Sequence, residues 1–73
     1  MSNAIYTKEH KNLIEKLKSA RLSAKLDQKT AAKRLNKSQS YISKMESGQR
    51  RVDLVQLKQI AEAYGRNIEY FIK

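Results

Sequence analysis

Residues 28–48, QKTAAKRLNKSQSYISKMESG, constrain the fold more than any other part of the chain. Asp27 and Ser38 are residue types that cap helix N-termini, because their side chains accept hydrogen bonds from the first free N–H groups. Asn36 and Gly48 tolerate the left-handed backbone that ends helices. The segment therefore predicts two short helices joined by a three-residue turn, Gln28–Leu35 and Gln39–Ser47.

The rest of the chain follows the same helical pattern. It contains no proline and only two glycines, which suits helices with short loops and does not suit β-hairpins. Apolar residues recur with the 3.6-residue period of amphipathic helices. We therefore expect an all-α fold, with five helices around one small core in a single domain, 1–73, whose residues 1–7 form a flexible arm. The other expected helices are about Lys8–Ala24, Leu54–Tyr64 and Ile68–Ile72.

The expected core follows from one face of each helix. Its members are Leu13, Leu17, Ala20 and Ala24 in the first helix, Ala31, Ala32 and Leu35 in the second, Ile42 and Met45 in the third, and Leu54, Leu57, Ile60, Ala61 and Tyr64 in the fourth; the apolar residues of the last helix are Ile68, Phe71 and Ile72.

Composition argues against several classes of protein. The chain has no cysteine and a single histidine, His10, without a cluster of acidic ligands, so we expect no metal and no cofactor. Paired carboxylates and a glycine-rich phosphate loop are missing from the pattern, so we do not expect an enzyme. The longest apolar runs are two or three residues, too short to span a membrane. The expected location is the cytoplasm, in association with the nucleoid.

The basic charge is concentrated in one part of the chain. The formal net charge is +9, and residues 16–51 carry eleven basic and two acidic groups, whereas basic and acidic groups balance in the remainder. Clustered positive charge is typical of proteins that bind polyanions. The alternatives are an ordinary lysine-rich surface, or a membrane-surface peptide built on the first helix.

Several motifs share the spacing of a known family. They are Leu26-Asp27-Gln28 at the start of the second helix, Ala32 and Leu35 within it, and Ser38, Ile42, Ser43, Glu46 and Gly48 in the third. The chain thereby resembles the phage repressor and Cro-like helix-turn-helix family, the XRE type, from about Leu13 to Ile72. The resemblance implies a lambda-repressor-like fold, whose helix-turn-helix consists of the second and third helices. It also implies a sequence-specific DNA-binding transcriptional regulator, with repression as the expected role.

The resemblance and the chemistry of the side chains together predict a DNA-binding site. With Ser38 as the N-cap, the expected exposed positions of the third helix are Gln39, Ser40 and Tyr41, followed one turn later by Ser43 and Lys44. Glutamine can recognise adenine and lysine can recognise guanine in the major groove. The expected base contacts are Gln39, Ser40, Ser43 and Lys44. The expected phosphate contacts are Gln28, Lys29, Lys37, Tyr41, Arg50 and Arg51.

The resemblance further implies a structural ion pair between Arg21 and Glu46. The chain departs from the family at Lys25, where glycine is usual between the first two helices. Lysine is costly in a left-handed turn, so we expect the first helix to end differently. Ala31 stands where leucine is common, and Arg66 replaces an aliphatic residue.

The family also implies partners. Members of this size pair as twofold dimers on inverted-repeat sites in double-stranded DNA. The expected homodimer interface comprises Val55, Arg66, Tyr70 and Ile72, although Phe71 and Ile72 could instead simply close the core. The alternative function is an antitoxin-type or other protein-interaction module, which would bind a partner protein with or without DNA.

Overall fold

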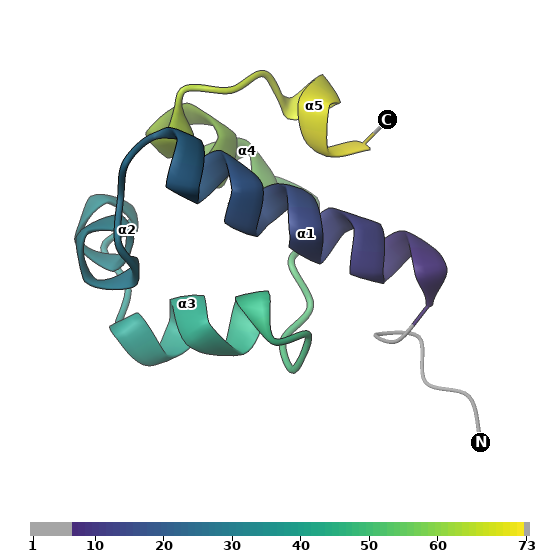
Figure 1. Ribbon diagram of the computed structural model, residues 1–73, viewed down its shortest axis with the longest axis horizontal. Coiled ribbons are helices and arrows are strands. Elements are labelled where there is room, and N and C mark those ends of the chain that lie inside the picture. Colours follow the sequence, from purple (N-terminus) through teal and green to yellow (C-terminus); the bar gives the residue numbers. More distant parts are fainter. Residues whose placement is uncertain (1–6, 73) are drawn as a thin grey trace.

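The computed structural model describes residues 7–72 and shows five α-helices with no strand in that range (Figure 1). The all-α, five-helix prediction is confirmed. The predicted helix limits agree with the observed ones to within one residue. The helices are α1 (Lys8–Ser23), α2 (Gln28–Leu35), α3 (Gln39–Glu46), α4 (Leu54–Tyr64) and α5 (Ile68–Ile72).

Four of the helices begin with the same contact. The side-chain oxygen of the preceding residue accepts a hydrogen bond, 2.7–3.2 Å long, from the N–H group three residues further on. Such caps satisfy donors that a helix leaves free at its start. Thr7 is therefore part of the start of α1, although the sequence assigned it to a flexible arm; residues 1–6 of that arm lie outside the described residues. The capping residues are Thr7, Asp27, Ser38 and Asp53.

The end of α1 differs from the expectation. Lys25 adopts the left-handed conformation itself, with φ 61°. Its N–H donates to the carbonyl of Leu22 at 2.9 Å, and the N–H of Leu26 donates to the carbonyl of Arg21 at 3.1 Å. This pair of bonds is the Schellman motif that usually ends on glycine. The helix thus ends as the family pattern requires, and Lys25 carries a backbone strain of about 1–2 kcal/mol.

Gly48 follows α3 at a position where glycine is required for two reasons. Its φ is 86°, in the left-handed region, and a Cβ atom there would lie 3.1 Å from Cδ1 of Ile14. Glycine therefore lets the chain turn sharply after α3 while this turn stays close to α1.

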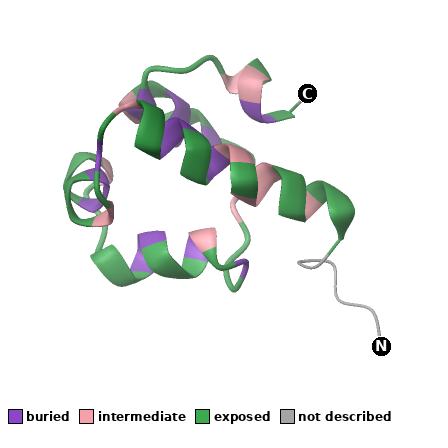
Figure 2. Cartoon of the chain, in the orientation of Figure 1, coloured by how far each residue is buried: buried purple, intermediate pink, exposed green. Residues whose placement is uncertain are grey.

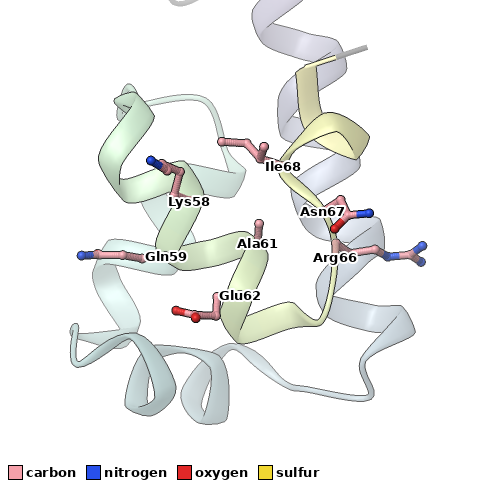
Figure 3. Close-up of a pocket in the computed structure, with 7 residues that line it drawn as sticks. All are labelled: Lys58, Gln59, Ala61, Glu62, Arg66, Asn67 and Ile68. Atoms are coloured by element: carbon pink, nitrogen blue, oxygen red, sulfur yellow. The ribbon is translucent and has the colours of Figure 1, made fainter.

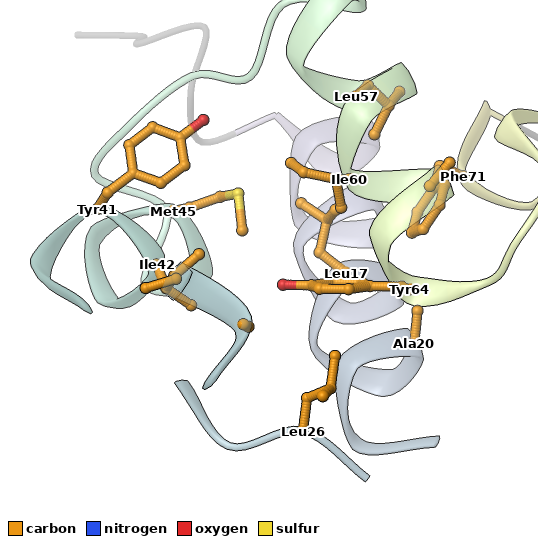
Figure 4. Close-up of a cluster of buried hydrophobic side chains, with 13 residues drawn as sticks. Leu17, Ala20, Leu26, Tyr41, Ile42, Met45, Leu57, Ile60, Tyr64 and Phe71 are labelled. Atoms are coloured by element: carbon orange, nitrogen blue, oxygen red, sulfur yellow. The ribbon is translucent and has the colours of Figure 1, made fainter. Parts of the chain in front are cut away.

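The core lies where the five helices meet, and Figure 4 shows its buried side chains. Leu17, Ile42, Met45 and Ile60 are its largest fully buried side chains. Two expectations for the core are wrong: Leu54, expected on the inner face of α4, and Ile72, which could instead have closed the core, are each 62% exposed. Leu54 lies on the same side of α4 as Leu57, but one turn nearer the start of the helix, where no described segment covers it. The buried set also contains Ala20, Leu26, Ala31, Ala32, Tyr41, Leu57, Ala61, Tyr64 and Phe71.

The arrangement of the helices leaves one side of α3 open. α2 packs against α3 and α4, whereas α3 and α5 both pack against α1. Figure 1 shows α3 along the lower edge of the molecule and α5 at the upper edge. Buried residues of α3 face the interior, and the exposed ones face away from it (Figure 2). None of the helices in residues 7–72 is long and apolar enough to cross a membrane.

Candidate nucleic-acid interface

The outer face of α3 carries four exposed polar side chains, Gln39, Ser40, Ser43 and Lys44. None of the four side chains forms a hydrogen bond or ion pair with another part of the described chain. On the opposite face, Ile42 and Met45 are fully buried. The helix is thus fixed from within, and its outer side chains remain available to a ligand.

A buried ion pair connects α3 to α1. Arg21 Nε lies 2.6 Å from Glu46 Oε2, and Arg21 Nη2 donates to Glu46 Oε1 at 3.0 Å. The remaining terminal nitrogen of Arg21 donates to the carbonyl of Leu26 at 2.8 Å. The two charged side chains are only 7% and 5% exposed. The hydrogen bonds to Glu46 raise the pKa of Arg21, so its guanidinium stays charged, and the two-pronged geometry of the pair fixes the angle between the helices.

Gln28 joins the same contact from α2. Its Nε2 atom donates to Glu46 Oε1 at 3.2 Å, and the side chain is half-buried. The sequence predicts a phosphate contact for Gln28, and the structure gives its amide this additional, internal partner. One carboxylate therefore connects three helices, α1, α2 and α3.

The N-terminus of α2 begins next to this network. Asp27 caps the helix, and the hydrogen bond from the Thr30 N–H lowers the pKa of the Asp27 carboxyl. The helix dipole and the free N–H groups of the first turn favour anions near this end. Lys29 is exposed in the same turn.

Tyr41 corrects the sequence prediction that it is an exposed residue of α3. Its side chain is 7% exposed, and its hydroxyl donates to Gln56 Oε1 in α4 at 2.7 Å. Burial raises the pKa of the Tyr41 hydroxyl. The spacing of four residues from the buried Met45 would have indicated the inner face.

Two cations contact the Tyr41 ring. Lys37 Nζ lies 5.2 Å from the ring centre, and the Arg50 guanidinium carbon lies 4.9 Å from it. Lys37 comes from the turn before α3, and Arg50 from the segment after it. Arg51, like both of these, is exposed. Arg34, by contrast, is directed toward α4, where it donates to the Ala63 carbonyl at 3.4 Å.

The residues predicted to form a dimer interface lie on α4, on α5 and in the turn between them. Val55 and Ile72 are 64% and 62% exposed. The Arg66 guanidinium lies 4.5 Å from the centre of the Tyr70 ring, which in turn contacts Phe71 edge-on. The structure thus brings Arg66 and Tyr70 together.

A shallow pocket lies beside Arg66, between α4 and the start of α5 (Figure 3). Lys58, Gln59 and Glu62 approach it from α4, and Asn67 and Ile68 from the other side. No residue of α3 lines this pocket. In residues 7–72, no group of three or more histidine, cysteine or acidic side chains is arranged to hold a metal ion.

Comparison with known families identifies the chain. A family model described as helix-turn-helix matches residues 17–71, which is most of the sequence and includes all of α2, α3 and α4. A search of curated proteins finds no match. The chain therefore belongs to the helix-turn-helix family of the XRE, or Cro/C1-like, type, a family of DNA-binding transcription regulators.

Proposed function

We propose that this protein binds double-stranded DNA sequence-specifically by inserting α3 into the major groove. One observation carries the proposal: the four exposed side chains on the outer face of α3 have no internal partner, while the inner face is fixed by apolar burial and by the Arg21–Glu46 pair. A rigid helix with a free polar face is what the major groove accommodates.

The four side chains differ in the base chemistry they offer. Gln39 can bond to N6 and N7 of adenine in two-pronged fashion, and Lys44 can donate to O6 and N7 of guanine. Ser40 and Ser43 can donate to or accept from either kind of base edge. We assign sequence preference to this set.

Phosphate contacts come from the cations around α3 and from the start of α2. Lys29, Lys37, Arg50 and Arg51 are exposed, and none of them is paired with a carboxylate within the described chain. Gln28 contributes through the first N–H groups of α2, since its side chain already contacts Glu46. Tyr41 is not among these contacts because its hydroxyl is bonded to Gln56.

The proposed biological role is transcriptional repression by a homodimer on an inverted-repeat operator. The exposed Val55 and Ile72, with the stacked Arg66 and Tyr70, form the proposed interface. Ile72 also lies at a pocket between α1, α4 and α5 whose lining includes the half-buried Leu13, so apolar surface continues beyond the single side chain.

Selection of bound duplexes from a random pool tests the proposal. We expect one enriched sequence, arranged as an inverted repeat if the protein binds as a dimer. Affinity for that sequence falls steeply with salt, by a slope of about 0.9 per phosphate contact in a double-logarithmic plot. A selection that enriches no sequence contradicts base readout by α3.

Two lysine variants assign the readout to α3. Lys44→Ala removes a proposed base contact, and we expect it to relax the preference at one base pair, at a cost of about 1–3 kcal/mol for the preferred sequence. Lys58→Ala is the matched control, since Lys58 is exposed on α4 and lines a pocket to which no residue of α3 contributes. Equal effects of the two variants on base preference contradict the assignment.

A further inference from the structure

The Tyr41 ring is a contact point for two cations from separate segments of the chain, and the DNA-binding role proposed above does not by itself account for it. We infer that Tyr41 is a positioning residue: its ring holds Lys37 and Arg50 at fixed places on either end of α3, where both meet phosphates of the DNA backbone. This inference rests on the proposed function and adds a mechanism by which the backbone contacts are set.

The ring suits this task better than a carboxylate would. A carboxylate partner neutralises a lysine or arginine, whereas the face of an aromatic ring attracts the cation and carries no net charge of its own. Among residues 7–72, neither Lys37 nor Arg50 forms an ion pair. Both cations are therefore held near α3 with their full charge available to phosphates.

The ring itself is held firmly. Tyr41 is 7% exposed, and its hydroxyl donates to Gln56 of α4 at 2.7 Å. Gln56 is fixed in turn, because its N–H donates to the capping carboxylate of Asp53 at 2.8 Å. The ring is thus anchored to both helices that flank the segment carrying Arg50, and it gives that segment a defined point of contact.

The two cations also constrain what binds beside them. Lys37 lies 5.2 Å and Arg50 4.9 Å from the same ring centre, so the two positive charges lie within about 10 Å of one another. Positive charges concentrated in this way increase the local attraction for an anion. A backbone phosphate next to the groove that receives α3 has this chemistry.

The first experiment compares Tyr41→Leu with Tyr41→Phe on the duplex recovered by selection, with affinity measured across a salt series. Tyr41→Phe keeps the ring, and we expect the salt slope to stay unchanged. Tyr41→Leu removes the ring, and we expect a several-fold loss of affinity on all sequences and a decrease in slope of about 1–2, equivalent to one or two phosphate contacts. Loss of stability alone lowers the folded fraction without changing the number of contacts.

A double-mutant cycle assigns the effect to the two cations. Lys37→Gln and Arg50→Gln each weaken binding in the parent protein, and we expect both effects to shrink in the Tyr41→Leu background. Lys29→Gln is the control, because Lys29 is an exposed cation that does not contact the ring; its effect stays the same in both backgrounds. Full additivity of Lys37→Gln and Arg50→Gln with Tyr41→Leu overturns the inference.

A fluorinated series covers the case in which Tyr41→Leu does not fold. Phenylalanine at position 41 with increasing ring fluorination keeps the shape of the side chain and progressively weakens its attraction for cations. We expect affinity to fall stepwise along the series, and a flat series overturns the inference. Failure of the parent protein to bind any duplex would instead overturn the proposed function, so the two failures are distinguishable.

Discussion

The surface around α3 and the surface formed by α4 and α5 differ in charge and in what keeps them in place. Residues 16–51 carry the entire net charge of the chain, whereas the remaining residues are balanced. The α3 side is held by a polar network on Glu46, in addition to its buried apolar residues. The α4–α5 side is held by Leu57, Ile60 and Phe71 and exposes apolar side chains to solvent.

This difference separates two physical tasks. Apolar burial stabilises a helix on its neighbours but is non-directional, so it sets the orientation only loosely. Hydrogen bonds from a planar guanidinium to a carboxylate are directional and fix an angle. The surface proposed to fit the major groove uses both kinds of contact, and the other side relies mainly on burial. Four changes test this contrast, and their expected effects on stability decrease from the first to the last.

Removal of the carboxylate at the centre of the polar network has the largest expected effect. Glu46→Ala leaves Arg21 buried without its counter-ion, and we expect a loss of about 3 kcal/mol or more in the free energy of unfolding. For a domain of this size the melting temperature then falls by more than about 10 °C. Thermal unfolding followed by circular dichroism measures the change.

A double variant sharpens the interpretation of this loss. Arg21→Met combined with Glu46→Leu replaces the pair by apolar residues, and we expect most of the stability to return. If the pair sets the angle of α3, DNA affinity stays low in the double variant. An unchanged melting curve for Glu46→Ala would show that the pair has no structural role.

Tyr64 is expected to make stability depend on alkaline pH. Its hydroxyl is buried, has no hydrogen-bond partner in the described chain and points from α4 toward Ile42 (Figure 4). Burial raises the pKa of Tyr64 from 10.0 to about 12. The folded state therefore favours the protonated hydroxyl. The stabilisation that results from this preference is full below pH 10 and is lost between pH 10 and about 12. We expect a loss of about 3 kcal/mol across this window, measured by urea unfolding.

Tyr64→Phe is the control for that window. This variant removes the titrating hydroxyl and leaves the ring. We therefore expect its free energy of unfolding not to show the loss between pH 10 and about 12 that Tyr64 causes. At neutral pH we expect it to be at least as stable as the parent, because it removes a buried polar group without a partner. Parallel pH curves for the two proteins would contradict the prediction.

Relief of the strained turn between α1 and α2 has a smaller effect of the opposite sign. Lys25→Gly removes the cost of φ 61° for a residue with a side chain, and we expect a gain of about 1 kcal/mol in the free energy of unfolding. Lys18→Gly places glycine at an exposed position within α1 and serves as the comparison. We expect it to lower the free energy of unfolding by about 1 kcal/mol. Destabilisation by both variants would show that the turn is not strained.

Changes to the exposed apolar residues of α4 have the smallest effect on the folded monomer. Val55→Ser and Leu54→Ser alter side chains that are more than half exposed, and we expect each to change the free energy of unfolding by less than about 0.5 kcal/mol. If Val55 belongs to a homodimer interface, the same change weakens self-association in sedimentation experiments. Leu57→Ala changes a residue on the buried side of α4. We expect it to lower the free energy of unfolding by about 2–5 kcal/mol, in contrast to the two exposed positions.

Local signals in the sequence predicted the helices well. Four of the five helices have a capping residue before them, and apolar residues recur along the faces that the helices bury. Both signals depend only on residues within a few positions. The burial of single residues was harder to predict, as Tyr41 and Leu54 show. Tyr41 is covered by α4, and Leu54 extends beyond its neighbours, so the outcome depends on which other segment lies opposite.

The same distinction applies to the candidate site. The exposed positions of α3 follow from its own period and its resemblance to the family. The contact of Gln28 with Glu46, and the grouping of Lys37 with Arg50 around Tyr41, bring together residues from different elements. The left-handed Lys25 went unpredicted because the hydrogen bonds that close α1 and the burial of Leu26 override the preference of the residue.

The freedom of the four outer side chains of α3 has an evolutionary consequence. Because Gln39, Ser40, Ser43 and Lys44 have no hydrogen bond or ion pair within the described fold, substitutions there cost little stability. Under the proposed readout by α3, a descendant of this chain can therefore acquire a different target by mutation of these positions alone, one at a time, while every intermediate still folds.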